Sequence, residues 1–317
     1  MNIGIIGNSR MAKFHLEVFK KIPKVNIACI ASTPSGSEER KKTAKKFKIF
    51  REYSSYKKML SENPNLDAVI IASRIDYNYE IAKYCISKKF NSLIEKPIAL
   101  NKKDALNLIK LANKNKVKVF TGLQRRFYSS SLKIKNIQKK YKLISISIEA
   151  PEDFTEILKK KKFKLKVLKK WVLGNGIHCI DLFRFFNGDI SNVITRVKNS
   201  RGYRKDYNSL IEFKNNTIGI YKSNWESGGT WTVKLYFKKF YILMSPLENC
   251  KIYYYSGKVK VIGLSKLDKL YKPGLYLQNY HFLKNLKSKT KYSNYLSDIN
   301  DAIKTFKLCS LIGNYKK

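Results

Sequence analysis

Short apolar runs alternate with helix-spaced segments along the first 122 residues. Asn2–Ile6 is an apolar run typical of a strand, Ser9–Lys20 has the apolar spacing of a helix, and Val25–Ala31 is a second strand-like run. These segments predict a β-α-β unit. The alternation continues with expected helices at Ser37–Phe47, Tyr56–Ser61, Tyr77–Lys88 and Lys103–Asn115 and expected strands at Ala68–Ala72, Ser92–Ile94 and Val117–Thr121. We therefore predict an α/β domain over residues 1–122, with a doubly wound parallel sheet.

The pattern changes after Gly122, where strand-like alternation becomes dominant. Expected strands lie at Ser145–Ala150, Val193–Lys198, Ser209–Lys214, Thr217–Ser223, Thr230–Phe237 and Tyr241–Met244. Expected helices lie at Gly176–Phe186, Leu277–Leu286 and Ser297–Ile312. Residues 123–317 are therefore predicted to form an α+β domain with a large, mostly antiparallel open sheet. Its last helix could pack back on the first domain.

Composition narrows the class of protein. The chain has 317 residues, of which 44% are apolar and 13% aromatic, so it is not a disordered chain and is long enough for two domains with separate cores. No run approaches the roughly 18 apolar residues that a spanning helix needs, and the N-terminus opens on a strand, so we expect a cytoplasmic protein. Five scattered cysteines and three histidines predict neither a disulfide framework nor a metal site.

The net charge of +42 raises the question of nucleic-acid binding. The basic residues are 55 Lys and 10 Arg, whereas base and phosphate recognition favours Arg, so a solvated basic surface is the simpler interpretation. The densest run, Lys159–Lys170, holds eight lysines in twelve residues, and its alternation predicts an exposed strand or loop. If this run has a role, attraction of an anionic substrate or cofactor would account for it.

A phosphate-binding turn is indicated between the first strand and helix. The dinucleotide fingerprint is G-x-G-x-x-G/A, and Gly7 and Ala12 match it, while Ser9 stands where the second glycine is expected. The serine hydroxyl could donate to a phosphate oxygen. We predict cofactor contacts from Gly7, Ser9, Arg10 and Met11, although a tight structural turn without a ligand would have the same pattern.

The expected ribose-binding position favours NADP over NAD. An NAD site places Asp or Glu about 20 residues after the turn, and here Ser32 and Thr33 occupy that region. Arg40, Lys41 and Lys42 follow closely and could bind a 2′-phosphate. The alternative is that these cations form the solvated face of the next helix.

A more specific motif, Glu95-Lys96-Pro97, follows the strand at Ser92–Ile94. Together with Gly7, Gln124-Arg125-Arg126-Phe127 and the segment Gly174–Asp181, in this order, it makes the chain resemble the Gfo/Idh/MocA family of oxidoreductases. The resemblance extends to the closing helix. It implies an NAD(P)-dependent dehydrogenase or reductase acting on a CH–OH group, in which a Rossmann domain holds the cofactor and the second domain binds a sugar, sugar nucleotide or polyol.

The resemblance also implies roles for individual residues. Lys96 would contact the reacting hydroxyl, where an ammonium stabilises a developing alkoxide, and the peptide bond before Pro97 is often cis in the family. His178 would exchange the hydroxyl proton, and Asp181, three residues later on the same helix face, could orient its ring or be a surface carboxylate. Further cofactor contacts would come from Ser73, Glu95, Lys96 and Gln124, and further substrate contacts from Arg126 and Asn175.

Two departures from the family pattern favour a second hypothesis. Gly174 stands where many members carry an aspartate, and Asn78 stands where the loop motif has a histidine. With Ser9, these changes leave open a dinucleotide-binding homologue without catalysis that acts as a sensor or partner protein. His15 is interpreted as structural, and His281 has no motif around it.

Family resemblance further suggests a homo-oligomer formed through the exposed face of the second sheet. The expected strands carry more apolar and aromatic residues than one buried face of the sheet needs, among them Ile218, Ile220, Tyr221, Trp231, Leu235 and Phe237. The alternative is an ordinary half-covered sheet.

Overall fold

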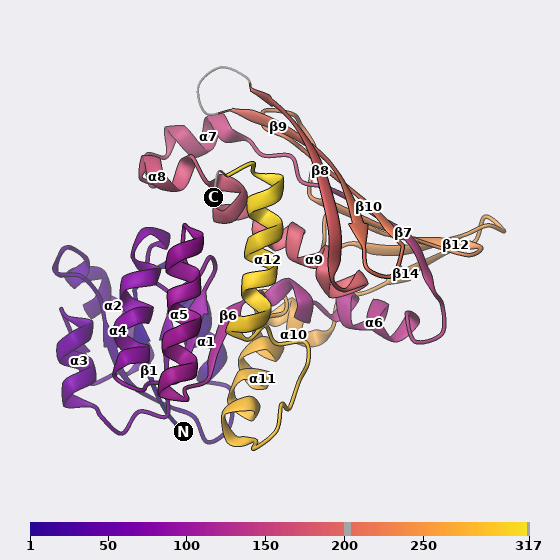
Figure 1. Ribbon diagram of the computed structural model, residues 1–317. Coiled ribbons are helices and arrows are strands. Elements are labelled where there is room, and N and C mark those ends of the chain that lie inside the picture. The colour runs from indigo at the N-terminus through magenta and orange to yellow at the C-terminus, as the bar shows by residue number, and fades with distance from the viewer. Residues whose placement is uncertain (200–203, 316–317) are drawn as a thin grey trace. The chain divides into compact units, whose positions relative to one another are not determined.

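The computed structural model describes residues 1–199 and 204–315, and its contacts divide the chain into two compact units (Figure 1). The first unit comprises Met1–Gln124 and Leu270–Ile303, and the second comprises Arg125–Lys269 and the chain from Lys304 onward. This division differs from the predicted split at residues 122/123, because a late segment of the chain joins the first unit. That segment is fixed partly by Lys118, whose ammonium donates to the carbonyl oxygens of Asn285, Leu286 and Ser288.

The first unit contains a six-stranded sheet with the order β3-β2-β1-β4-β5-β6, and all its neighbouring strands are parallel. The predicted doubly wound parallel sheet is therefore confirmed. The strand order reverses between β1 and β4, which is the point where such sheets bind ligands. The strands are β1 (Asn2–Ile6), β2 (Asn26–Ala31), β3 (Arg51–Tyr53), β4 (Ala68–Ile71), β5 (Ser92–Glu95) and β6 (Val119–Gly122).

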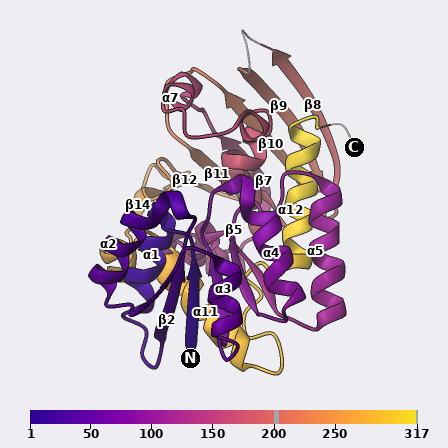
Figure 2. The ribbon, with the colours of Figure 1, turned by 90° about the vertical axis from the view of Figure 1, so that its left-hand side faces the viewer.

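Helices cover the sheet, and the first five of those named next also connect its strands. They are α1 (Arg10–Phe19), α2 (Ser37–Phe47), α3 (Tyr56–Glu62), α4 (Asn78–Ser87), α5 (Lys102–Asn115) and α11 (Leu275–Lys287). Figure 2 shows α4 and α5 side by side, and α11 packs against α1. Every residue of β4 and β5 is buried, so this sheet is the core of the unit. The last helix, α12 (Ile299–Ile312), begins in the first unit and continues in the second.

The second unit contains an eight-stranded sheet with the order β14-β13-β12-β11-β7-β10-β9-β8. Only the pair β7 and β10 is parallel within the described part of this sheet, so the predicted mostly antiparallel sheet is confirmed. Its strands are β7 (Leu143–Glu149), β8 (Ile190–Asn199), β9 (Lys205–Phe213), β10 (Ile218–Asn224), β11 (Thr232–Phe237), β12 (Phe240–Met244), β13 (Cys250–Tyr254) and β14 (Val259–Ile262).

The two faces of this sheet differ in character. Helix α9 (Ile177–Asn187) packs on one face, and a Cβ at Gly219 of β10 would lie 3.0 Å from the Phe183 ring, so a larger residue there would have to displace this ring slightly. The apolar residues named above divide between the faces. Tyr221, Leu235 and Phe237 are core residues, Trp231 is half-buried, and Ile218 and Ile220 are exposed.

The lysine-rich run was expected to be a strand or loop, and the expectation of a strand is wrong. Helix α7 (Phe154–Lys159) ends in it, and a short helix α8 (Leu165–Leu168) lies within it. The Asp153 carboxylate caps α7 by accepting from the Glu156 N–H at 2.9 Å, and Val167 and Leu168 are buried. The cap from Asp153 and the burial of Val167 and Leu168 therefore favour helices here, although the alternation of the sequence predicted a strand. The lysines from 159 to 169 are exposed.

Several short elements were not predicted. They are β3, β13, β14, α6 (Ser129–Ile137) and α10 (Lys266–Leu270). Within the described residues, no helix combines the length and apolarity needed to cross a bilayer. All five cysteines are buried free thiols.

Candidate functional site

A cavity of about 560 Å³ opens in the first unit where β1, β2 and β4 end. Five of the predicted cofactor residues line it, namely Gly7, Ser9, Ser32, Thr33 and Ser73. Asn8, Arg74 and Tyr77 also line it, and none of them was a predicted cofactor residue. Arg10 and Met11, which begin α1, do not line it. The cavity therefore gathers residues from loops far apart in the sequence at the place where the strand order reverses.

Gly7 fits the turn after β1 because no other residue would. Its φ of +118° lies in the region that L side chains rarely adopt, and a Cβ there would lie 2.3 Å from the Ala72 carbonyl oxygen. The backbone thus passes directly over the end of β4. This close approach, followed by a helix N-terminus, is the arrangement that binds a pyrophosphate in Rossmann folds.

Ser9 is used by the fold itself. Its hydroxyl donates to the Ala72 carbonyl at 2.8 Å and accepts from the Ala12 N–H at 3.3 Å, so it caps α1 and ties the turn to β4. The expected bond from this hydroxyl to a phosphate stays a prediction, because its proton is given to Ala72 here. Arg10 and Met11 begin α1, where backbone N–H groups are available to an anion.

Ser32 is joined to a buried cation rather than to a surface one. The Arg40 guanidinium donates from Nη1 to Ser32 Oγ at 3.1 Å, and its Nε lies 3.4 Å from a Glu52 carboxylate oxygen. Arg40 is only 5% exposed, whereas Lys41 and Lys42 are exposed on α2. Of the three cations, Arg40 therefore lies beside the residue that replaces the expected carboxylate.

The Glu95-Lys96-Pro97 turn is held by Asn78. The buried Asn78 amide donates to the Glu95 carbonyl at 2.8 Å and to the Pro97 carbonyl at 3.0 Å, and the Ser73 hydroxyl donates to its oxygen at 2.9 Å. The Lys96–Pro97 peptide bond is cis. Both carbonyls that flank Lys96 are thus fixed by one side chain, the residue that departs from the family pattern.

The Glu95 side chain is fixed from the other direction. Its Oε1 lies 3.0 Å from His15 Nε2, and His15 Nδ1 lies 3.1 Å from Asn279 Oδ1. His15 and Asn279 are fully buried. These contacts account for His15 as a structural residue of the motif, and they leave Lys96 as the half-buried member of a rigid turn.

In the second unit, a five-residue π-helical turn (Val172–Gly176) leads into α9 and His178. Such turns are frequent at functional sites. Asn175 in this turn donates its amide to both carboxylate oxygens of Glu152, at 2.7 and 3.0 Å. A carboxylate from the segment after β7 therefore lies beside the turn where Gly174 replaces the aspartate of the family pattern. No sequence signal had marked Glu152.

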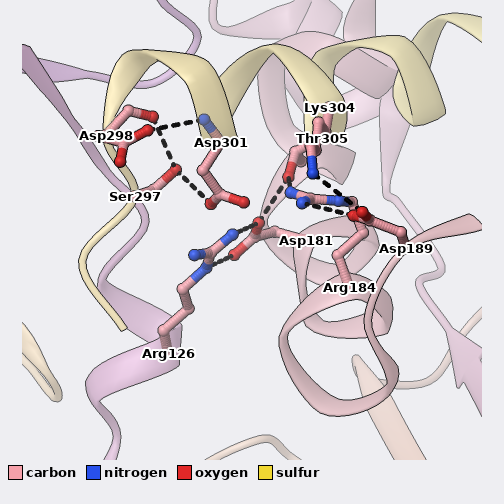
Figure 3. A network of polar contacts seen from close by, with 9 residues as sticks. All are labelled: Arg126, Asp181, Arg184, Asp189, Ser297, Asp298, Asp301, Lys304 and Thr305. Atoms are coloured by element: carbon pink, nitrogen blue, oxygen red, sulfur yellow. Dashed lines mark hydrogen bonds and ion pairs between the residues drawn. The ribbon is translucent and has the colours of Figure 1, made fainter. Parts of the chain in front are cut away.

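Asp181 and Arg126 form a buried ion pair (Figure 3). Arg126 donates from Nη2 and Nε to the two carboxylate oxygens of Asp181, at 2.5 and 2.6 Å, and Thr305 donates to the same carboxylate at 2.8 Å. Arg184 in turn donates to Thr305 at 2.9 Å. Asp181 and Arg126 are 1% and 4% exposed, and the cluster joins α9 to the segment after β6 through Arg126 and to α12 through Thr305. Its expected roles toward His178 and the substrate stay predictions.

The remaining predicted residues divide between the units. Lys96 and Gln124 belong to the first unit, and His178 and Asn175 to the second. Gln124 is 2% exposed, and its Oε1 has no hydrogen-bond partner among residues 1–199 and 204–315. Gln124 does not line the cavity, whereas the Gly7 turn, which has no room for a Cβ, and the position of the cavity at the strand reversal together fit a bound dinucleotide.

Comparison with known proteins gives the family of the first unit. Residues 1–123 match the sequence profile described as "Oxidoreductase family, NAD-binding Rossmann fold". The chain is 32% identical over 136 residues to myo-inositol 2-dehydrogenase of Thermotoga maritima, which covers 43% of this chain and 40% of that protein. The match thus spans less than half of the curated relative.

Solved structures match nearly the whole chain. An oxidoreductase from Agrobacterium radiobacter, in complex with NAD+, L-tartaric acid and magnesium, has a TM-score of 0.81 at 16% identity and covers 98% of this chain and 94% of its own. UDP-N-acetylglucosamine 3-dehydrogenase from Acidithiobacillus ferrooxidans has a TM-score of 0.80 at 17% identity, with coverages of 99% and 97%. At these identities the likeness shows the fold alone.

Proposed function

Because this chain belongs to the Gfo/Idh/MocA family of oxidoreductases, with an NAD-binding Rossmann domain, we propose that it transfers a hydride between NAD(P) and a carbinol or carbonyl carbon of a sugar, sugar nucleotide or polyol. The observation that carries the proposal is that one unit contains both the Gly7 cavity and the turn in which Asn78 holds Lys96. The named activities of a relative, an inositol dehydrogenase, and of a structural neighbour, a sugar-nucleotide dehydrogenase, support the substrate class.

Each step of the proposed reaction is assigned to residues of this chain. Gly7, Ser32, Thr33 and Ser73 bind the dinucleotide, and the N-terminus of α1 contacts its phosphates. When bound, the nicotinamide supplies a hydride acceptor or donor. Lys96 stabilises the oxygen of the reacting hydroxyl as charge develops on it, and His178 takes or returns the proton.

Turnover with a substrate panel tests the proposal. Purified protein should reduce NAD+ or NADP+, followed at 340 nm, with at least one member of a panel of polyols, sugars, sugar phosphates and sugar nucleotides. Dinucleotide binding without turnover over the whole panel would favour the second hypothesis, a non-catalytic homologue.

We propose NADPH as the preferred cofactor, because Arg40 lies on Ser32 where an NAD site has a carboxylate. Ser32→Asp should weaken NADPH binding by about tenfold or more, since the new carboxylate repels a 2′-phosphate and pairs with Arg40. Fluorescence titration with NADH and NADPH measures both affinities. Lys41→Gln, on the exposed face of α2, is the matched control and should change them little. Tighter binding of NADH than NADPH by the wild type would contradict the preference.

A second copy of the chain is the partner that we propose for the open face of the eight-stranded sheet. Ile194, Leu210 and Ile220 stand directly opposite one another across β8, β9 and β10, and they are 52%, 39% and 56% exposed. Light scattering should give at least twice the chain mass of 36.9 kDa, and Ile220→Glu should lower the mass toward that of the monomer. A wild-type monomer at micromolar concentration would reject this assembly.

A further inference from the structure

Arg125 differs from the arginine that follows it. Arg126 is neutralised by Asp181, whereas Nε and Nη1 of Arg125 are buried and have no hydrogen-bond partner within the described parts of the chain. Arg125 also makes no ion pair with a carboxylate there. A guanidinium that keeps its charge in a half-buried position without an acid is costly unless an anion binds to it.

The neighbouring carboxylates are engaged with other donors. Tyr128 donates to Glu248 at 3.0 Å, and Asn175 donates to Glu152 at 2.7 Å. Burial raises the pKa of the Cys179 thiol to about 12; the charge of Arg125 lowers it, and those of Glu152 and Glu248 raise it. The three charges therefore lie around Cys179, the residue after His178, and Arg125 is the cation among them.

The Trp231 indole connects Arg125 with His178. The Arg125 guanidinium carbon lies 4.6 Å from the centre of a Trp231 ring, and the His178 ring centre lies 6.5 Å from Trp231. Trp231 is fixed because its N–H donates to the Pro151 carbonyl at 3.1 Å. The cation therefore stacks on an aromatic ring that also neighbours the imidazole, so a single small molecule could contact both.

We propose that Arg125, stacked on Trp231, forms an anion subsite that binds a phosphate or carboxylate group of the substrate beside His178. The proposal rests on the proposed function and deepens it, because it assigns the substrate to anionic sugars or polyols. The planar fork of a guanidinium suits two oxygens of such a group, and the half-buried position strengthens the bond. The sequence had marked Arg126 for the substrate, and the present proposal adds its neighbour Arg125 as the residue that meets the anionic group.

Inorganic phosphate is the first probe, because it needs neither cofactor nor turnover. Equilibrium dialysis with radiolabelled phosphate, at constant ionic strength, should give saturable binding to the wild type. Arg125→Gln should weaken it by roughly tenfold to a hundredfold, the size expected for one charge-assisted hydrogen bond. Arg125→Lys should restore part of the affinity, since it keeps the charge but not the fork.

Lys162→Gln is the control for general surface charge, because Lys162 is exposed in the lysine-rich run. It should leave phosphate binding unchanged. Equal losses in the Arg125 and Lys162 variants, both removed by added KCl, would overturn the subsite and assign phosphate binding to the basic surface. Unchanged binding in Arg125→Gln would also overturn it.

Kinetics with a matched substrate pair distinguishes the subsite from the proposed function. Arg125→Gln should raise KM for an inositol or sugar phosphate by roughly tenfold or more, and leave KM for its neutral counterpart and Kd for NADPH unchanged. A rise in the NADPH Kd alone would show that the anion is a cofactor phosphate and contradict the proposal. Wild-type inactivity over the whole panel would reject the proposed function, while the dialysis result would still decide the anion subsite.

Discussion

Replacing Lys96 by alanine should lower kcat by about a hundredfold to a thousandfold and leave the Kd of the reduced cofactor within about twofold of the wild type. The expected loss arises because alanine removes the positive charge of the Lys96 ammonium. Lys96 is the half-buried residue of a turn whose two flanking carbonyls are both held by Asn78, so its position is fixed by the fold. An ammonium fixed beside a reacting hydroxyl favours the transition state, where negative charge develops on the oxygen, more than the ground state.

Lys103→Ala is the matched control for Lys96→Ala, because it removes an exposed lysine near the start of α5. It should leave kcat unchanged. Stopped-flow measurement of the hydride-transfer step in both variants separates chemistry from cofactor binding and release. Retained turnover in Lys96→Ala would remove this lysine from the mechanism.

Replacing Asn78 by alanine should lower both stability and turnover. The change deprives the buried carbonyls of Glu95 and Pro97 of their donor, which costs about 2 to 4 kcal/mol of unfolding free energy. It also frees the turn that carries Lys96, so we expect kcat to fall by about tenfold or more even where the protein is folded. Urea denaturation measures the first effect, and kcat at a temperature well below the transition measures the second.

Asn91→Ala is the control that separates the positioning of Lys96 from a general loss of stability. Asn91 also bridges the backbone of the first unit, donating to the Asp67 carbonyl at 3.2 Å and accepting from the Lys118 N–H at 2.9 Å, but it lies before β5 rather than after it. We expect Asn91→Ala to lower stability and to leave kcat unchanged. If both asparagine variants lose stability and neither loses turnover, Asn78 has a structural role only.

Much of the first unit was predictable because each strand, helix and turn is specified by residues that lie close together in the sequence. Each strand is a short apolar run, and each helix has its own apolar face, as in Asn2–Ile6 followed by α1. The turns carry their own signals, since Gly7 and the Glu95-Lys96-Pro97 motif stand at strand ends. The late segment of this unit could not be assigned in the same way. Its place depends on contacts between residues far apart in the sequence, such as those of Lys118 with residues more than 160 positions away and that of His15 with Asn279.

The candidate site was harder to predict than the fold. Spacing alone made Asp181 a partner for His178, but the cation that neutralises Asp181 comes from position 126, which no periodicity can indicate. The same contact engages Arg126, which is why we propose its neighbour Arg125 as the residue that meets an anion. Glu152 next to Asn175 is a further long-range contact, and it brings a carboxylate to a turn where the sequence suggested that none was left.

The most direct test of the account is binding of NADH and NADPH to the purified protein, measured by fluorescence titration and by release of carried-over nucleotide on gentle denaturation. The central claim is that the Gly7 turn, with Ser9 in place of a glycine, holds a dinucleotide. We predict saturable binding at submillimolar concentration, tighter for NADPH than for NADH. Absence of binding to either nucleotide would leave the fold unaffected and would contradict the assignment as an NAD(P)-dependent oxidoreductase.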